Sequence, residues 1–256
     1  MSDNTTSAEH SKGLSVLEPA PRLLRGDYLF VLAVMMLATA ACLPGLNEHL
    51  WFDEALTVVY TLRDAPWEII TVFEGINNHI FYSLSANFSI SLFGESAWSV
   101  RLPALLFAIL SLPALYYFCL QLGDRKAAVL ATVFLGFNYY FAWYALDARG
   151  YTGVMLATTL ASVLFVKVIS ARRASLGLLL AYALVVALGA WTHLTGVVVA
   201  LAHGVLWVFI SLRPLMKGEW LRPLRQFAAL LGAAAMTLLL YSPVLASLVE
   251  HIHWRR

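Results

Sequence analysis

Carboxylates beside apolar segments are the residues of this chain that could do chemistry. Asp53 and Glu54 follow the first apolar segment, and Asp147 follows the third, two positions before Arg149. An acidic side chain at a membrane boundary is costly to keep unless it binds or reacts. A deprotonated Asp53 could accept a proton from a hydroxyl or amine, which is the general-base role. Glu54 is expected either to assist there or only to cap a helix.

Several basic and aromatic residues are candidates for contact with a substrate. Arg149 and Tyr151 stand at the start of a predicted helix, where the guanidinium and the free backbone N–H groups could hold a phosphate. His79, His193 and Arg101 are each predicted to lie near the same surface. No spacing of histidine or cysteine indicates a metal site.

The same residues also allow ordinary structural interpretations. Asp53 could simply cap its helix. Asp147 and Arg149 could form a surface ion pair, and Tyr151 could be one of the aromatic residues common at membrane interfaces. A lone histidine is more often a packing residue than a ligand or a base. Local sequence alone leaves both interpretations open.

The composition indicates a membrane protein. Of the 256 residues, 61% are hydrophobic and 12% are charged, and the mean hydropathy is +0.75. Such a chain has too little polar surface to cover a water-soluble globule. The net charge of +2 is small and spread between apolar runs, which argues against a nucleic-acid-binding surface. Cys42 and Cys119 both lie in apolar runs, and no nucleotide-binding motif is present.

The apolar segments predict an all-α membrane protein with about seven transmembrane helices, plus two or three interfacial or re-entrant helices in the first outer loop. The predicted spans are residues 28–45, 98–122, 127–145, 151–169, 176–191, 194–212 and 227–248. Residues 1–26 are predicted to form a disordered cytoplasmic tail, and residues 27–256 a single transmembrane module. The positive-inside rule then predicts a cytoplasmic N-terminus.

The first outer loop, residues 47–78, has six acidic residues and a single arginine, Arg63. Apolar residues at helical spacing after Asp53 predict a helix that lies in the interface with Asp53 facing water. Residues 67–74 predict a second short helix, because a proline precedes them and a glycine follows them.

Residues 79–93 decide the topology. They are apolar but number only 15, whereas a bilayer crossing needs roughly 20 residues. We therefore predict a re-entrant or interfacial helix, which puts Asp53 and Asp147 on the same outer face.

Six short motifs, in this order, resemble those of the GT-C glycosyltransferases. They are Trp51-Phe52-Asp53-Glu54-Ala55, Asn78-His79, Leu92-Phe93-Gly94-Glu95-Ser96, Val100-Arg101-Leu102-Pro103-Ala104, Asp147-Ala148-Arg149-Gly150-Tyr151 and Thr192-His193. The resemblance runs from about Gly26 to Leu248. It is greatest to the bacterial branch related to protein O-mannosyltransferases, lipid A aminoarabinose transferases and rhizobial galacturonosyltransferases. Each motif is weak alone, and their order makes the signal specific.

The resemblance implies a membrane glycosyltransferase that moves a sugar from a polyprenyl-phosphate donor to a lipid, glycan or protein acceptor, on the outer face of the bacterial inner membrane. Asp53 matches the first-loop acid proposed as the base, and Asp147 matches the acid of the second outer loop. Arg149 would lie near the donor phosphate, and His193 matches a histidine or lysine at that helix end. His79 stands where many relatives have His-Pro-Pro, but both prolines are absent here.

No cofactor is predicted, and a divalent cation at the leaving phosphate stays open. Relatives continue beyond the length of this chain, so the resemblance predicts a module that is truncated at its C-terminus. Two other functions also stay open: a polytopic transporter or lipid flippase, and an inactive truncated partner of a full-length transferase. Acids at the outer ends of helices, rather than near the bilayer midplane, favour the transferase.

Overall fold

The computed structural model describes residues 22–73, 79–171 and 173–254, the stretch 251–254 by its backbone alone. Every regular element in these ranges is a helix, so the predicted all-α class is confirmed. The α-helices are α2 (Arg25–Cys42), α3 (Phe52–Thr57), α4 (Pro66–Thr71), α5 (Ile80–Phe93), α6 (Ala97–Gln121), α7 (Arg125–Gly136), α8 (Tyr139–Ala145), α9 (Tyr151–Ser170), α10 (Leu176–Thr192), α11 (Val197–Met216), α12 (Leu221–Tyr241) and α13 (Leu245–Trp254). Shorter 3₁₀ or π segments are η2 (Leu43–Gly45), η3 (Val58–Leu62), η4 (Leu194–Gly196) and η5 (Ser242–Val244).

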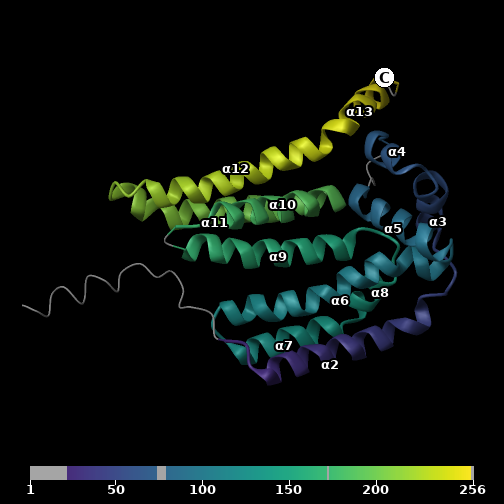
Figure 1. Cartoon of the computed structure of the whole chain (residues 1–256), viewed down its shortest axis with the longest axis horizontal. Helices are drawn as coiled ribbons and strands as arrows, with labels where there is room; N and C mark the ends of the chain where they lie inside the picture. Colours follow the sequence, from purple (N-terminus) through teal and green to yellow (C-terminus); the bar gives the residue numbers. More distant parts are fainter. Residues whose placement is uncertain (1–21, 74–78, 172, 255–256) are drawn as a thin grey trace, which may run out of the picture.

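The long helices run alongside one another, and the short helices α3, α4, α5, α8 and α13 gather at one end of the bundle (Figure 1). Small residues let the long helices approach closely, as is common in membranes. A Cβ added at Gly189 in α10 would lie 2.8 Å from the Cβ of Ala157 in α9. One added at Gly153 would lie 3.1 Å from the ring of Phe107 in α6. These glycines therefore let α6, α9 and α10 pack closely.

The described residues do not support the predicted count of seven spans. Within the described residues, five helices are long and apolar enough to cross a bilayer, or six if the bent pair α7 and α8 forms one span. The predicted span 176–191 is the apolar helix α10, whose 17 residues fall short of that length. The predicted span 127–145 is broken into two helices that meet at an angle of 59°.

The break between α7 and α8 has a local cause. Asn138 caps α8, because its side-chain oxygen accepts the backbone N–H of Tyr140 at 2.8 Å. Such a cap begins a new helix with its own direction. Gly136, the last residue of α7, packs closely against α2, where an added Cβ would lie 3.1 Å from Val34. The bend turns the aromatic residues of α8 toward the end of the bundle where α3 lies.

Helix α5 is the segment predicted to turn back without crossing. Its 14 residues give a length of about 21 Å, against about 30 Å for the apolar core of a bilayer. It lies at the same end of the bundle as α3 and α4 (Figure 1). Its polar face packs on the first turn of α6: the hydroxyl of Tyr82 donates to the carbonyl of Val100 at 2.8 Å, and that of Ser89 to the carbonyl of Ser99 at 2.6 Å. The polar face of α5 thus packs against protein.

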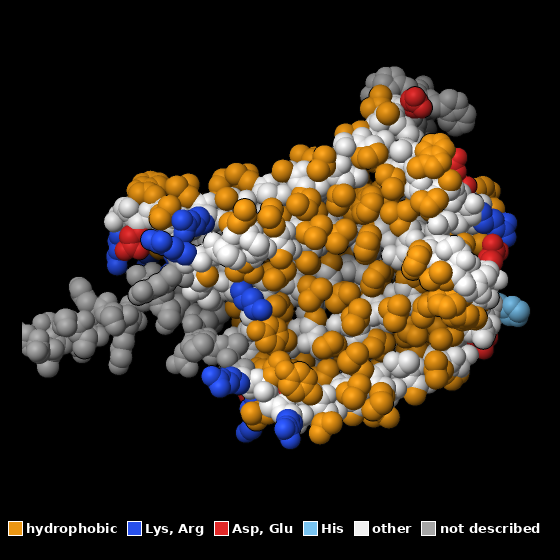
Figure 2. All heavy atoms as spheres, in the orientation of Figure 1, with side chains coloured by type: hydrophobic (Ala, Val, Ile, Leu, Met, Phe, Trp, Pro, Cys, Tyr) orange, Lys and Arg blue, Asp and Glu red, His pale blue; other side chains and the backbone are white. Residues whose placement is uncertain are grey.

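Charge divides the bundle lengthwise. Lysine and arginine side chains gather at the end opposite α3 and α4, whereas acidic side chains are more prominent beside those short helices (Figure 2). At the basic end, buried Asp27 in α2 pairs with Arg125 at 2.9 Å and accepts the hydroxyl of Tyr116 at 2.6 Å. The predicted tail lies outside the described residues up to position 21, and its last two residues begin α2.

Candidate functional site

The two acids of the first loop point in opposite directions from the first turn of α3. The side chain of Glu54 is 0% exposed, and that of Asp53 is 53% exposed. Glu54 turns back to accept the backbone N–H of Trp51, the residue before α3, at 2.8 Å. Neighbouring helix positions face different sides, so one carboxylate enters the protein while the other meets solvent.

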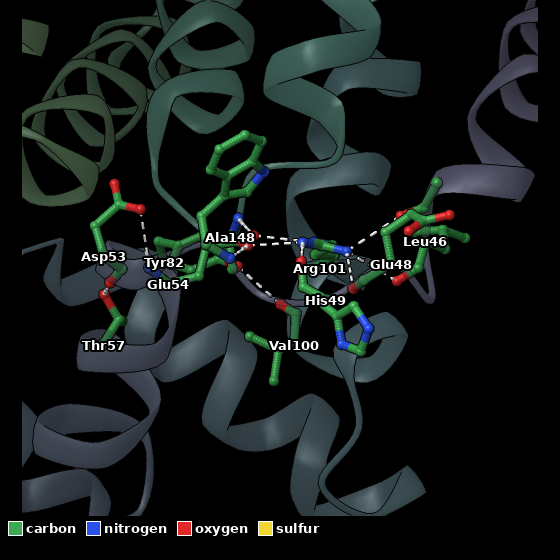
Figure 3. Close-up of polar contacts among 12 residues, drawn as sticks. Leu46, Glu48, His49, Asp53, Glu54, Thr57, Tyr82, Val100, Arg101 and Ala148 are labelled. Atoms are coloured by element: carbon green, nitrogen blue, oxygen red, sulfur yellow. Dashed lines mark hydrogen bonds and ion pairs between the residues drawn. The ribbon is translucent and has the colours of Figure 1, made fainter.

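Glu54 forms a fully buried ion pair with Arg101 of α6 (Figure 3). The Nε of Arg101 donates to one carboxylate oxygen at 2.9 Å, and Nη2 donates to the other at 2.7 Å. The guanidinium also donates to the backbone carbonyls of Gly45, Leu46, Glu48 and His49. Figure 3 shows Arg101 between Glu54 on one side and Leu46 and Glu48 on the other. The charges of both side chains are therefore satisfied inside the protein.

This pair joins three distant parts of the chain. The carboxylate of Glu54 also accepts the backbone N–H of Ala148, beside Asp147, at 2.7 Å. The first loop, α6 and the segment after α8 are thus fixed to one another. Sequence reasoning proposed Glu54 and Arg101 for substrate contact, which stays untested. The geometry of Glu54 and Arg101 indicates that this pair positions Asp53 and Asp147.

Asp53 meets Arg149, which lies just before α9. Its Oδ2 is 2.7 Å from Nη1 of Arg149, whose side chain is only 7% exposed. The other two nitrogens of the guanidinium, Nε and Nη2, each lie 3.3 Å from Nε2 of His79. The arginine is thus held between a carboxylate from the first loop and the imidazole that precedes α5.

His79 is a neutral imidazole at neutral pH. Burial lowers its pKa to about 3, and the positive charge of Arg149 and the neighbouring His193 act in the same direction. Because Arg149 can only donate, the Nε2 that faces it must carry the lone pair. Nδ1 lies 3.3 Å from the backbone nitrogen of Gly150, and the Thr192 backbone is a further hydrogen-bond partner of this ring. His79 therefore orients Arg149 without adding charge.

Four predicted residues form one group, which we call the Arg149 cluster: Arg149, His79, Tyr151 and His193. The ring of His79 lies 4.7 Å from that of His193 and 5.6 Å from that of Tyr151, and the guanidinium carbon of Arg149 lies 5.8 Å from the Tyr151 ring centroid. Burial lowers the pKa of His193, and Arg149 lowers it further. The cluster therefore presents one permanent cation framed by aromatic rings.

The backbone at Gly150 is what allows this approach. A Cβ there would lie 2.7 Å from Nδ1 of His79 and 2.7 Å from the carbonyl oxygen of Thr192. Real Cβ atoms do not make contacts this short, so only glycine fits without displacing its neighbours.

Asp147 is half-buried beside the same group. Burial, together with the negative charges of Glu54 and Asp53, raises its pKa to about 7 against the opposing effect of Arg149 and Arg101. A carboxylate that titrates near neutral pH is suited to exchange a proton with a substrate.

Asp53 and Asp147 line one open cleft of about 770 Å³, which we call the acidic cleft. Its lining residues are Gly45, Glu48, His49, Leu50, Trp51, Phe52, Asp53, Arg101, Trp143, Leu146 and Asp147. The structure thus brings the two acids together in one hollow, as the sequence predicted for a single outer face. The volume lies in the range of small-molecule sites, about 300–1,000 Å³.

Sequence reasoning did not single out Trp143, His49 or Glu48 as site residues. Trp51 stands in the sequence only as part of a motif. The angle of 59° between α7 and α8 turns Trp143 into the cleft. No pattern within one helix signals that bend apart from Asn138, a common cap residue.

Among the residues that the structure describes, no group of three or more histidine, cysteine or acidic side chains could hold a metal ion.

Comparison with known proteins gave one match. A sequence profile for a family described as dolichyl-phosphate-mannose-protein mannosyltransferase matches residues 80–246, more than half of the chain. The matched range contains Arg101, Asp147, Arg149 and His193, whereas Asp53 precedes it. No curated protein matched the chain, and no solved structure did either.

Proposed function

The chain belongs to the dolichyl-phosphate-mannose-protein mannosyltransferase family, and from this premise we propose that it transfers a sugar from a polyprenyl-phosphate donor to a lipid, glycan or protein acceptor. It is a membrane glycosyltransferase by family and by its apolar helices. The proposal concerns the donor that supplies the sugar and the acceptor that receives it.

The observation that carries this proposal is the placing of two carboxylates beside a buried cation. Asp53 and Asp147 line the acidic cleft, and the 2.7 Å contact of Asp53 with Arg149 joins that cleft to the Arg149 cluster. Glycosyl transfer needs an acceptor of protons on one side of the reacting carbon and stabilisation of a leaving phosphate on the other. Asp53 is proposed for the first task and Arg149 for the second, and their contact joins the two.

In the proposed reaction, the acceptor oxygen attacks the anomeric carbon of the sugar while the bond from that carbon to the phosphate oxygen breaks. The acceptor proton passes to the carboxylate of Asp53, and the polyprenyl phosphate leaves with the bonding electron pair. Attack from the side opposite the phosphate inverts the configuration at carbon. Asp147 orients the acceptor through a hydrogen bond from it.

Arg149 is the proposed partner of the donor phosphate. Its guanidinium already contacts Asp53, so an arriving phosphate competes for Arg149 and releases the carboxylate. An arginine–phosphate pair is charge-assisted and strengthens as negative charge develops on the leaving group. Tyr151 and His193 would frame the same phosphate.

The reaction is proposed for the outer face of the cell membrane. Basic side chains gather at the end of the bundle opposite the site (Figure 2), and basic ends favour the cytoplasm. On that basis the acidic cleft opens to the periplasmic or extracellular side, with the N-terminus inside.

The test is sugar transfer by the full chain in liposomes that contain a polyprenyl-phosphate donor with a labelled sugar, with membrane extracts as a source of acceptors. Asp53→Asn is expected to lower the rate about 100- to 10,000-fold, the usual worth of a general base. Asp64→Asn is the matched control, because Asp64 lies in the same loop but outside the acidic cleft. Wild-type transfer that Asp53→Asn leaves intact would remove the base assignment. Donor movement across the bilayer without any covalent product would instead favour a transporter.

A further inference from the structure

The acidic cleft has an aromatic wall that the proposed chemistry does not use. Trp51 and Trp143 both line it, with ring centroids 5.4 Å apart and ring planes at 43°. They remain 59% and 43% exposed. Because the two ring planes are tilted rather than stacked, each indole keeps part of its face exposed to the cleft.

The positions of the two rings are fixed by the fold. Trp51 lies directly before α3, and its backbone N–H is held by the buried carboxylate of Glu54 at 2.8 Å. Trp143 lies in α8, where Tyr139 packs against it with ring centroids 5.9 Å apart. These contacts place both tryptophans at the cleft before any ligand arrives, which lowers the entropic cost of binding.

Charge in the cleft restricts what can bind there. Glu48, Asp53 and Asp147 line it, and the one arginine in its wall, Arg101, is neutralised by Glu54 at 2.7 Å. A phosphate or carboxylate on a ligand would meet like charges here, whereas hydroxyl and ammonium groups would find acceptors. The available cation, Arg149, belongs to the neighbouring cluster.

We propose that the acceptor is a carbohydrate, and that Trp51 and Trp143 hold a neutral or amino-substituted sugar ring in the acidic cleft. The C–H face of a pyranose packs on an indole, while its hydroxyls point to the carboxylates of Asp53 and Asp147. This inference rests on the proposed function, since it names the acceptor class of the same site. Anionic groups of a larger glycan stay outside the cleft.

An exposed tryptophan outside the cleft offers a comparison for Trp51 and Trp143. Trp67 in α4 is 64% exposed and also lies among the short helices at this end of the bundle, but it does not line the cleft. Trp67 is therefore a matched control, as a ring of the same kind outside the site.

The experiment measures ligand binding by saturation-transfer NMR, with the full chain in nanodiscs and four probes. These are methyl glucoside, methyl glucosaminide, glucose 6-phosphate and a peptide rich in serine and threonine. The two uncharged or cationic sugars are expected to bind, and the phosphorylated sugar to bind at least about tenfold more weakly. Trp51→Ala and Trp143→Ala should weaken sugar binding about tenfold or more, Trp51→Phe should restore part of it, and Trp67→Ala should leave it unchanged.

Two outcomes would overturn the inference. Sugars that bind equally to the wild type and to Trp143→Ala, or a peptide that binds while the sugars do not, would reject the carbohydrate wall. Thermal unfolding of each variant shows whether it is folded, and the phenylalanine variant keeps the test decisive if alanine destabilises the protein. Loss of the inference leaves the proposed function standing if labelled transfer still depends on Asp53, so the two failures are distinguishable.

Discussion

At the scale of single residues, the two carboxylates of the acidic cleft differ in their surroundings. Asp53 has a cation against it at 2.7 Å, whereas Asp147 has burial and two neighbouring negative charges that raise its pKa to about 7. Environments that separate two acids in this way commonly assign them different roles. The proposed roles differ accordingly: Asp53 acts as the base once an arriving phosphate draws Arg149 away from it, and Asp147 exchanges a hydrogen bond with the acceptor and orients it.

The first prediction concerns pH. Below about pH 7 Asp147 gains a proton and no longer acts purely as a hydrogen-bond acceptor, so the KM for the acceptor should rise as pH falls through 7. Asp147→Asn should abolish this dependence as well as lower the rate. His49→Gln is the control: it removes another ionisable side chain from the lining of the same cleft, and the pH dependence should remain. Steady-state transfer at fixed donor concentration from pH 5 to 9 gives the profile, and an unchanged profile in Asp147→Asn would contradict the assignment.

The same residue makes a prediction about stability. The folded protein keeps the proton of Asp147 up to about pH 7, whereas the unfolded chain loses it near 3.8, so stability declines as pH rises between these values. The full cost is present above pH 7 and absent below 3.8. Asp147→Asn should therefore raise the free energy of unfolding at pH 8 by roughly 1–3 kcal/mol and change it little near pH 4. Denaturant unfolding in detergent at both pH values measures it.

At the scale of elements, the Glu54–Arg101 pair is the joint between the first loop, α6 and the segment after α8. Removing one partner of a buried pair leaves an uncompensated charge and costs about 3–5 kcal/mol. Glu54→Gln and Arg101→Met should each lower stability by about that amount, and the double variant should recover part of the loss. Arg63→Met is the control, since the Arg63–Glu95 pair is exposed at 54% and 45%. Additive losses in the double variant would show that the two side chains are not coupled.

Also at the scale of elements, the backbone at Gly150 closely approaches neighbouring segments. Gly150→Ala would force a Cβ against His79 and the Thr192 carbonyl, and should destabilise the protein by about 1–3 kcal/mol while raising the donor KM. Gly177→Ala is the matched control, because a Cβ there meets nothing within 4 Å and alanine favours a helix. Thermal unfolding and donor titration compare the two. Equal effects would mean that the tight contact at Gly150 has no consequence.

At the scale of the whole molecule, the bundle has a basic end and an end that carries the site. In a background with Cys42→Ala and Cys119→Ala, a cysteine in place of Asp64 should react with a membrane-impermeant maleimide added to intact cells that lack an outer membrane. A cysteine in place of exposed Lys217, in the turn after α11, should react only after lysis. The reverse pattern would put the site in the cytoplasm and contradict the proposed face of transfer.

The sequence alone determined the class of the protein and nominated the residues of a candidate site. Composition predicted an all-α membrane protein, and the 15-residue length of segment 79–93 predicted a helix that turns back. Asp53, Asp147, Arg149, His79, Tyr151 and His193 were singled out from position and motif order, and the structure brings them together in the cleft and the adjoining cluster. The class could be predicted because hydropathy is a local property of the chain, whereas the turning back of segment 79–93 and the roles of these residues remain predictions.

Tertiary structure alone decided which acid is buried and where the helices break. In α3 and η3 the buried stripe runs through Glu54, Val58 and Leu62, so an acid stands among the apolar residues of the buried face. Burying Glu54 is affordable only because Arg101, 47 residues away, neutralises it. Periodicity reports neighbours within one or two turns, so it cannot reveal a partner at that separation. The same physical reason hid the meeting of Trp51 with Trp143, which the bend before α8 brings about.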